Sequence, residues 1–146
     1  MKMDDDFIES NDLDWFASFS DGYLAHFTSG GTNLIPEKVK CCLESYEIVY
    51  NYFANLKGNY EFEIIEENLP HFDDSTKRNQ YISSFIDAAA KGLFSYNRNF
   101  NDGRYFLIAK PLNPLLLNDL PENISNKLNE LPKGMQSGKK YITEIE

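Results

Sequence analysis

The stretch Asp14–Phe27 constrains the fold more than any other part of the chain, because one β-hairpin register sorts its side chains into two distinct faces. A three-residue loop with Gly22 in the left-handed conformation pairs Phe19 with Tyr23. A shift of one residue would mix polar and apolar side chains on both faces. The register predicts one apolar face of Trp15, Ala17, Phe19, Tyr23, Ala25 and Phe27 and an opposite face of Phe16, Ser18, Leu24, His26 and Thr28. Because the two alanines are small, we expect a helix to pack against the apolar face.

The rest of the chain alternates helical and strand patterns. Apolar residues at three- and four-residue spacing predict helices over 36–57 and 75–91 and a short helix over 121–131. Alternation predicts strands at 60–64 and 141–145, and the turn Asn101-Asp102-Gly103 predicts a second hairpin within 93–109. Hairpins with interspersed helices are typical of α+β domains. We therefore predict a mainly antiparallel sheet built from two hairpins plus extra strands, with two longer helices and one short helix packed on one face.

Length and charge limit the domain count and the class of partner. The chain has 146 residues, of which 42% are hydrophobic, and this predicts a single domain over 1–146. Residues 1–12 form an acidic lead that we expect to be poorly ordered and to dock through Phe7 and Ile8. The net charge of −9, from 23 acidic and 14 basic residues, argues against nucleic acid and anionic membranes as partners. The same charge would steer a basic protein towards the chain.

Cysteine usage and the first residues indicate the compartment. The start of the sequence lacks the apolar segment of a signal peptide, and no apolar run approaches the roughly 20 residues of a membrane helix. Cys41 and Cys42 are adjacent and match neither a disulfide framework nor a zinc site, so we expect buried structural thiols. These features predict a cytoplasmic protein without a metal or other cofactor.

One candidate site is a ligand pocket formed by Trp15, His26, Gly30 and Gly31. The glycines precede the helix predicted to begin at Pro36, and free backbone N–H groups at such a place can hold an anion. The loop lacks the lysine and the spacing of a phosphate-binding P-loop. His26 and His71 lack metal-ligand spacing, so a structural role is the alternative for both. A pocket in which His26 meets a carboxylate would favour a small-molecule-binding or enzymatic domain, although the sequence contains no nucleophile elbow or Cys–His signature.

The other candidate site is an acidic surface for a basic protein partner. We expect the contact to be made by Glu61, Glu63, Glu66, Glu67, Asp73 and Asp74 with the aromatic residues Tyr60 and Phe72. The acids of the Asp4–Asp14 segment are expected to extend this surface, and Phe62, Phe100 and Tyr105 to add aromatic area. Acidic side chains give orientation and association rate, whereas aromatic side chains give binding energy. Whether the chain is a monomer or a homodimer stays open at this point.

The segment Asp14–Pro36 resembles the opening of a group of small bacterial cytosolic proteins, some of which are immunity proteins of polymorphic toxin systems. The likeness rests on Asp14-Trp15-Phe16-Ala17, Asp21-Gly22, Ala25, Phe27, Ser29-Gly30-Gly31 and Leu34-Ile35-Pro36. It covers about the first quarter of the chain and carries over no catalytic residue. The resemblance implies an acidic single-domain protein that neutralises a toxin by binding it. Protein binding is therefore the expected function, with a small-molecule-binding or enzymatic domain as the alternative.

Overall fold

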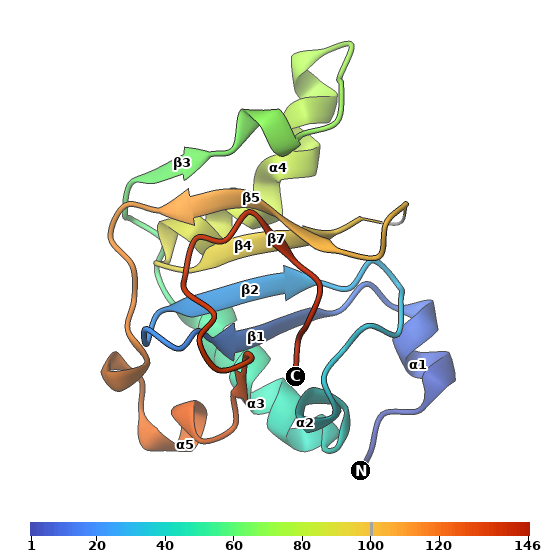
Figure 1. The fold of residues 1–146 in the computed structure, drawn as a ribbon, viewed down its shortest axis with the longest axis vertical. Coiled ribbons are helices and arrows are strands. Elements are labelled where there is room, and N and C mark those ends of the chain that lie inside the picture. Colours follow the sequence, from blue (N-terminus) through green and yellow to red (C-terminus); the bar gives the residue numbers. More distant parts are fainter. Residues whose placement is uncertain (100) are drawn as a thin grey trace.

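The structure, a computed structural model, describes residues 1–99 and 101–146 and has an α+β fold (Figure 1). The described residues form one mixed sheet in the order β3-β5-β4-β2-β1-β6, with β7 paired to β5. Its strands are β1 (Asp14–Ser18), β2 (Leu24–Thr28), β3 (Phe62–Ile64), β4 (Phe94–Arg98), β5 (Tyr105–Pro111), β6 (Asn129–Glu130) and β7 (Tyr141–Ile142). The helices are α1 (Asp5–Ser10), α2 (Glu37–Lys40), α3 (Leu43–Asn55), α4 (Ser75–Ala90) and α5 (Glu122–Ser125), and the 3-10 turns are η1 (Glu66–Asn68) and η2 (Leu117–Asp119).

The first hairpin, β1–β2, has the predicted register. Ala17 pairs with Ala25, and the Phe19 N–H donates a hydrogen bond to the Tyr23 carbonyl (2.9 Å). Gly22 has φ +88°, the left-handed conformation that the three-residue loop requires. The sorting of side chains and the chemistry of the turn therefore determine this register together.

The second hairpin, β4–β5, joins the first through a parallel pair. His26 of β2 lies beside Ser95 of β4. This pair and the β1–β6 pair are parallel, so the sheet is mixed although most of its strand pairs are antiparallel. The apolar strand β5 lies inside the sheet, between β4 and β3. Both features agree with the predicted sheet built from two hairpins plus extra strands.

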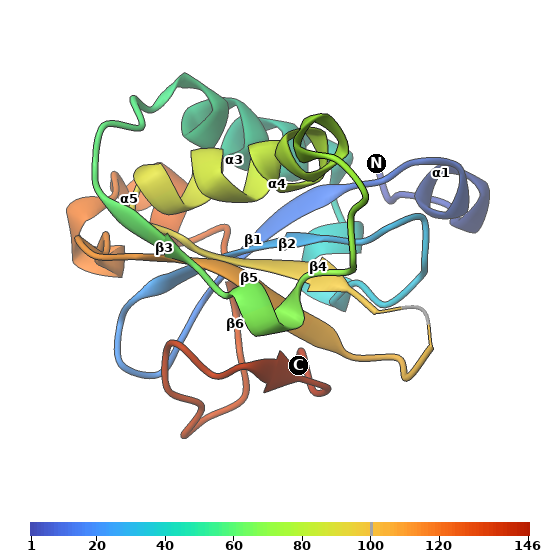
Figure 2. The same cartoon turned by 90° about the horizontal axis from the view of Figure 1, so that it is seen from above.

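The two longer helices, α3 and α4, and the short helix α5 lie on one face of the sheet, as predicted (Figure 2). They cover the hairpin face that carries Phe16 and Leu24. The side chains that meet this face include Val49 and Phe53 from α3, Ala88 from α4 and Ile124 from α5. This face therefore forms the core between the sheet and the helices.

The two ends of the chain cover most of the opposite face. Trp15 stacks on Phe27 with ring centroids 4.1 Å apart, and Phe27 stacks on Tyr96 at 5.1 Å. The sequence predicts a helix over this face, but the helix found there is the short α2, which contributes Val39. Residues from both termini complete the cover, among them Met3, Ile8, Leu13, Leu131, Ile142 and Ile145. Because both faces are covered, every residue of β2 is buried.

The helix predicted over 36–57 is instead two helices, because the chain becomes extended at Cys42 (φ −148°, ψ 106°). The N-terminal residues pair with the backbone on both sides of this break. The Met3 N–H donates to the Lys40 carbonyl (2.9 Å), and the Leu43 N–H donates to the carbonyl of the first residue (2.6 Å). Cys41 is consequently exposed and Cys42 is half-buried, so the prediction of buried thiols is wrong.

The acidic lead contains the helix α1 rather than the poorly ordered segment that composition suggested. The Asp4 carboxylate accepts a hydrogen bond from the Phe7 N–H (2.8 Å) and caps the helix. Ile8 is fully buried, whereas Phe7 is exposed, so the segment docks through only one of the two expected side chains. Backbone capping by an acidic side chain is a local effect that a count of charges does not reveal.

Helix α4 begins and ends where the sequence predicts. The Asp74 carboxylate accepts a hydrogen bond from the Lys77 N–H (2.8 Å) at its start. The chain then turns at Gly92, which has φ +100°. A Cβ at this position would lie 2.8 Å from the Leu115 nitrogen, so the close approach of two backbones requires glycine here.

The C-terminal elements are shorter than predicted. The helix expected over 121–131 ends at Ser125, and the chain then pairs alongside β1 as β6. The Asn129 side chain donates to the Ile145 carbonyl (2.9 Å), which holds this extended conformation against the C-terminus. The strand expected over 141–145 is the two-residue β7. The apolar side chains expected to face inward, Ile124, Leu128 and Leu131, are nevertheless buried.

Candidate functional site

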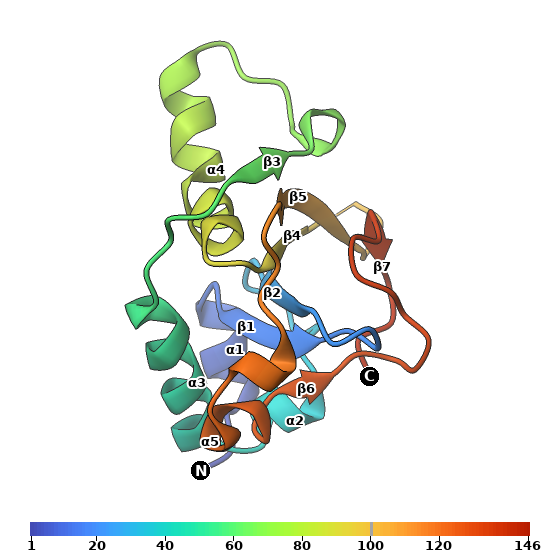
Figure 3. The same cartoon turned by 90° about the vertical axis from the view of Figure 1, so that its left-hand side faces the viewer.

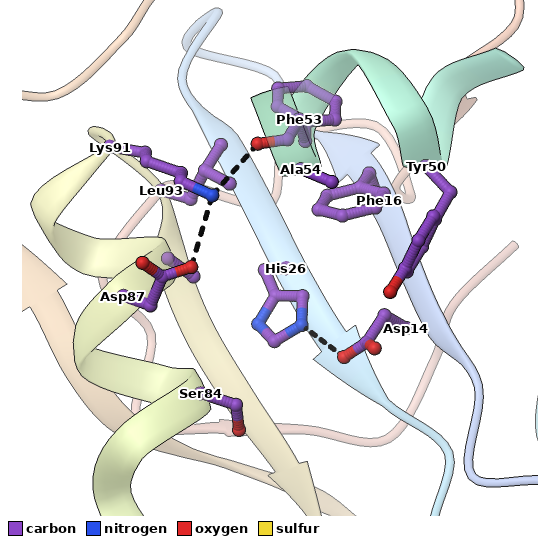
Figure 4. Close-up of a pocket in the computed structure, with 11 residues that line it drawn as sticks. Asp14, Phe16, His26, Tyr50, Phe53, Ala54, Ser84, Asp87, Lys91 and Leu93 are labelled. Atoms are coloured by element: carbon purple, nitrogen blue, oxygen red, sulfur yellow. Dashed lines mark hydrogen bonds and ion pairs between the residues drawn. The ribbon is translucent and has the colours of Figure 1, made fainter. Parts of the chain in front are cut away.

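A pocket lies over the first hairpin, between α3 and α4 (Figure 4). Its volume is about 250 Å³. Strands β1 and β2 form its floor, and the two helices form its walls. The lining residues are Asp14, Phe16, His26, Tyr50, Phe53, Ala54, Ser84, Asp87, Ala88, Lys91 and Leu93.

His26 is the buried polar centre of this pocket, with only 4% of its surface exposed. Its Nε2 lies 2.7 Å from Asp14 Oδ1, and its Nδ1 lies 2.7 Å from Ser95 Oγ. These partners come from the strands on either side of β2, so the sheet register brings the three side chains into one row. The imidazole is therefore fixed at both ring nitrogens.

The row Asp14–His26–Ser95 is not a hydrolase triad. Ser95 is completely buried and does not line the pocket, so a substrate in the pocket would not reach its hydroxyl. Asp14 is the member of the row that is exposed in the pocket, because 33% of its side chain is accessible. The geometry thus presents to the pocket a carboxylate held by a histidine, and not the serine hydroxyl.

Lys91 brings a second charge to the pocket but is already paired. Its ammonium donates to the Phe53 carbonyl (2.9 Å) and lies 3.0 Å from Asp87 Oδ2, one helical turn earlier on α4. The lysine side chain is only 10% exposed. Lys91 therefore ties the end of α4 to the end of α3, and its charge is matched by Asp87.

The structure does not assemble the ligand pocket predicted from the sequence. Of its four residues, His26 lines the pocket described here, whereas Trp15 lies on the opposite face and donates to the Tyr105 hydroxyl (3.2 Å). Gly30 and Gly31 lie in the loop after β2, with positive φ at both. The Gly30 N–H donates to Asp12 Oδ1 (2.7 Å), so a carboxylate of the chain itself occupies the position proposed for an external anion.

The acidic surface predicted for a protein partner lies on β3, η1 and the loop that leads to α4. All six of its carboxylate residues are exposed: Glu61, Glu63, Glu66, Glu67, Asp73 and Asp74. Three have basic partners within the chain, in the pairs Glu63–Lys110, Glu66–Arg78 and Glu67–Lys140. Asp74 is engaged as the cap of α4. The surface is therefore acidic but partly compensated.

The aromatic residues expected on this surface differ in exposure. Tyr60 is 54% exposed, and Phe72 is half-buried against Tyr81, with ring centroids 5.3 Å apart. Phe62 is half-buried and packs against the core under α4. Tyr105 is completely buried in the aromatic core, which is the cluster of Trp15, Phe27, Tyr96 and Tyr105 on the face of the sheet opposite α3 and α4. Its hydroxyl donates to the Leu34 carbonyl (2.8 Å), and its predicted exposure is wrong. Phe100 lies outside the described residues.

The acids of the N-terminal segment do not extend this surface. Helix α1 and strand β3 lie at opposite ends of the molecule in two perpendicular views (Figures 1 and 3). The expectation of one acidic arc is therefore wrong, because the sheet separates the two groups of acids. Sequence reasoning also missed Tyr50, Asp87 and Lys91 in the pocket. The i,i+4 spacing of the last two predicts that they share a helix face, but nothing local predicts their approach to α3.

Neither a metal site, nor a membrane-spanning helix, nor a similar known protein identifies the class of this chain. Within residues 1–99 and 101–146, no group of three or more His, Cys, Asp or Glu residues could hold a metal ion. None of the helices in the described part of the chain is both long enough and apolar enough to cross a membrane. No family model, curated protein or solved structure matches the chain. The fold and the pocket therefore define an α+β domain, and its function has to be argued from its surfaces.

Proposed function

We propose that the chain is a binding protein for a basic protein partner, and that the surface formed by β3, η1 and the start of α4 makes the contact. The observation that carries the proposal is the combination of exposed carboxylates with an exposed aromatic ring on one edge of the sheet. Glu61 and Glu63 lie on this edge, and Tyr60 beside them is 54% exposed. The net charge of −9 favours the approach of a cationic partner over long distances.

The internal ion pairs of this surface do not oppose such a contact. Glu66 and Glu67 pair with Arg78 and Lys140, and at least one side chain of each pair is more than half exposed. Exposed ion pairs contribute only about 0–1 kcal/mol, because solvent screens them. A partner's lysine or arginine can therefore replace the internal cation at little cost.

Strand β3 adds backbone groups to the same surface. It lies at the end of the strand order and pairs with β5 alone among the described strands. The Ile65 N–H donates to the Ile108 carbonyl, and the Leu112 N–H donates to the Glu61 carbonyl. In an antiparallel pair the intervening residues turn their backbone groups away from the partner strand. Phe62 and Ile64 therefore offer N–H and C=O groups to an added strand.

Neutralisation of a toxin is the specific form of this function that we propose. It rests on the resemblance of Asp14–Pro36 to immunity proteins. In such a system the binding protein acts by covering the partner, so it needs no catalytic residue of its own. The burial of the Ser95 hydroxyl in the row of Asp14, His26 and Ser95 is compatible with that role.

A capture experiment with matched variants tests the proposal. The test variant carries Glu61→Gln, Glu63→Gln, Glu66→Gln and Glu67→Gln, and the control carries Asp6→Asn, Glu9→Gln, Glu47→Gln and Glu144→Gln. Both lose four negative charges, but only the first loses them from the proposed surface. Each protein is used to capture partners from an extract of the source organism at low salt and at about 1 M salt, where the Debye length falls to about 3 Å.

The expected result has three parts. The unchanged chain and the control capture the same basic protein at low salt, the test variant does not, and high salt releases it. The captured protein then inhibits growth when produced alone, and co-production of the chain restores growth. Capture of no basic protein at low salt, or equal capture by both variants, would overturn the proposal. A captured protein that is harmless when produced alone would contradict the proposal that the partner is a toxin.

One observation favours a second candidate, a small-molecule-binding protein. His26 and the carboxylate of Asp14 meet at a pocket of about 250 Å³, and a pocket of this kind is what a small-molecule-binding domain requires. This candidate is independent of the acidic surface, because the pocket and β3 involve different residues.

A further inference from the structure

We infer that the pocket between α3 and α4 binds an organic ammonium group, with Asp14 as its counter-ion and Tyr50 and Phe16 as its aromatic walls. The inference rests on the second candidate function and is independent of the binding of a protein at β3. It assigns a ligand class to a site from the charge balance and the geometry of its lining.

When His26 is neutral, the formal charges of the pocket lining leave an excess of negative charge. The formally charged side chains are Asp14, Asp87 and Lys91. Lys91 is matched by Asp87 at 3.0 Å. Among the described residues, no lysine or arginine lies within ion-pair distance of Asp14, whose partner is His26. A neutral imidazole donates a hydrogen bond to this carboxylate but leaves its charge in place.

The buried row of side chains holds the Asp14 carboxylate in position. When the Ser95 hydroxyl donates to His26 Nδ1, the ring proton is on Nε2 and points to Asp14 Oδ1. This assignment gives each of the three groups a partner. The other oxygen of Asp14 has no hydrogen-bond partner among the described protein groups, so it is available to a ligand.

Aromatic rings lie beside this carboxylate. Figure 4 shows the hydroxyl end of Tyr50 close to Asp14, with Phe16 next to it. Phe16 is stacked on Phe53 with ring centroids 4.4 Å apart, which fixes its orientation. An ammonium group beside a carboxylate and over the face of an aromatic ring gains from both the ion pair and the cation–π interaction.

An anion or a large ligand fits the pocket less well. An anion attracted by Lys91 would meet the carboxylates of Asp87 and Asp14 at the same time. The volume of about 250 Å³ is below the roughly 300–1,000 Å³ of pockets for drug-sized ligands. A small amine is therefore the class that the lining favours, either as a free molecule or as a lysine side chain of another protein.

A titration followed by nuclear magnetic resonance tests this inference on the full, ¹⁵N-labelled chain. The probes are benzylammonium, its neutral analogue benzyl alcohol and its anionic analogue benzoate, which share one ring and differ in charge. Nα-acetyl-lysine N-methylamide represents a lysine of another protein. We expect benzylammonium or the lysine derivative to shift the backbone signals of Asp14, His26 and Tyr50. Whichever of the two binds tighter identifies the source of the amine.

Two variants separate the site from the general negative charge. Asp14→Asn keeps an acceptor for His26 but removes the charge, and it should weaken the binding of the amine by at least about tenfold. Asp6→Asn removes one exposed charge elsewhere and should change the affinity less than about twofold. A dispersed spectrum of Asp14→Asn shows that the variant is folded.

Three outcomes would overturn the inference. They are binding of benzyl alcohol or benzoate as tight as that of the amines, unchanged affinity in Asp14→Asn, and shifts confined to residues away from the pocket. Binding of the uncharged or anionic probe in the pocket would leave the second candidate function intact and refute only the ligand class. The absence of any probe binding would likewise refute only the ligand class, and the capture experiment at β3 would stand separately.

Discussion

At the scale of single residues, His26 shows how the sheet builds a polar site inside an apolar layer. The imidazole lies between the Phe16 ring at 5.4 Å and the Phe85 ring at 6.4 Å, measured between ring centroids. A buried polar group in such surroundings is costly unless its hydrogen bonds are made. Asp14 and Ser95 make them from the neighbouring strands. The row is therefore as much a stabilising element as a possible binding site.

Replacement of Ser95 by alanine tests that role. Ser95→Ala removes the partner of His26 Nδ1 and leaves a buried nitrogen without a hydrogen bond. We expect the free energy of unfolding to fall by about 1–3 kcal/mol in urea denaturation. Ser83→Ala, an exposed serine on α4, is the matched control and should stay within about 0.5 kcal/mol. Equal effects of the two substitutions would show that the hydrogen bond to His26 contributes nothing.

The residue scale also shows where sequence reasoning could have gone further. The predicted hairpin register already puts Trp15 and His26 on opposite faces, so these residues could not line one pocket. Asp14 lies two residues before Phe16, the cross-strand partner of His26, and was therefore a foreseeable neighbour. Ser95 and Lys91 were not foreseeable, because the parallel pairing of β2 with β4 is a tertiary contact. No local pattern encodes it.

At the scale of elements, local chemistry decides where helices begin and end. Asp74 caps α4, and the predicted start and end of that helix are confirmed. The predicted helix over 36–57 fails for the opposite reason, since its apolar spacing continues through Cys41 and Cys42 while the backbone does not. Backbone hydrogen bonds between this break and the first three residues of the chain hold it in place. Periodicity detects the buried stripe of a helix but not a partner that interrupts it.

Two neighbouring aspartates allow the cap of α4 to be tested with an internal control. Asp74→Ala removes the acceptor for the Lys77 N–H, and the free energy of unfolding should fall by about 0.5–2 kcal/mol. Asp73→Ala removes an exposed carboxylate one residue earlier, whose side chain is near His71 rather than the helix backbone. Its effect should stay within about 0.5 kcal/mol. A larger loss in Asp73→Ala than in Asp74→Ala, measured by chemical denaturation, would contradict the capping assignment.

At the scale of the whole molecule, a sheet buried on both faces joins two cores. The aromatic core contains Tyr96 and Tyr105, both completely buried. Burial raises the pKa of Tyr105 to about 12 and raises the pKa of Tyr96 as well, because the ionised phenolate would lose its hydration. Because of these two tyrosines, the free energy of unfolding depends on pH in the alkaline range.

The raised pKa of these tyrosines determines whether stability rises or falls with pH. A tyrosine in the unfolded chain ionises near pH 10, whereas Tyr105 in the fold stays protonated up to about pH 12. Above about pH 10 the unfolded state therefore binds fewer protons, and stability falls as the pH rises. We expect the urea midpoint to decrease between about pH 10 and about pH 12. A midpoint that is unchanged over the alkaline range would contradict the burial of these phenols.

The whole-molecule scale also limits what charge counting can predict. The acids at the N-terminus and those around β3 were expected to form one surface, but the fold places them at opposite ends (Figures 1 and 3). The α+β class and the single layer of longer helices were predictable from periodicity, because each element has its own pattern. The relative position of charged loops was not, because it depends on the order of strands in the sheet. The surface on β3 therefore has to be tested by itself.

Amide hydrogen exchange on the complex with the captured basic protein is the most direct measurement of the proposed binding surface. We predict that the partner slows exchange within residues 60–67, most of all at Phe62 and Ile64, whose N–H groups face away from β5. The amides of α1 at the opposite end should exchange at the same rate with and without the partner. Protection confined to α1 or to other regions, with unchanged exchange in β3, would contradict the proposed surface.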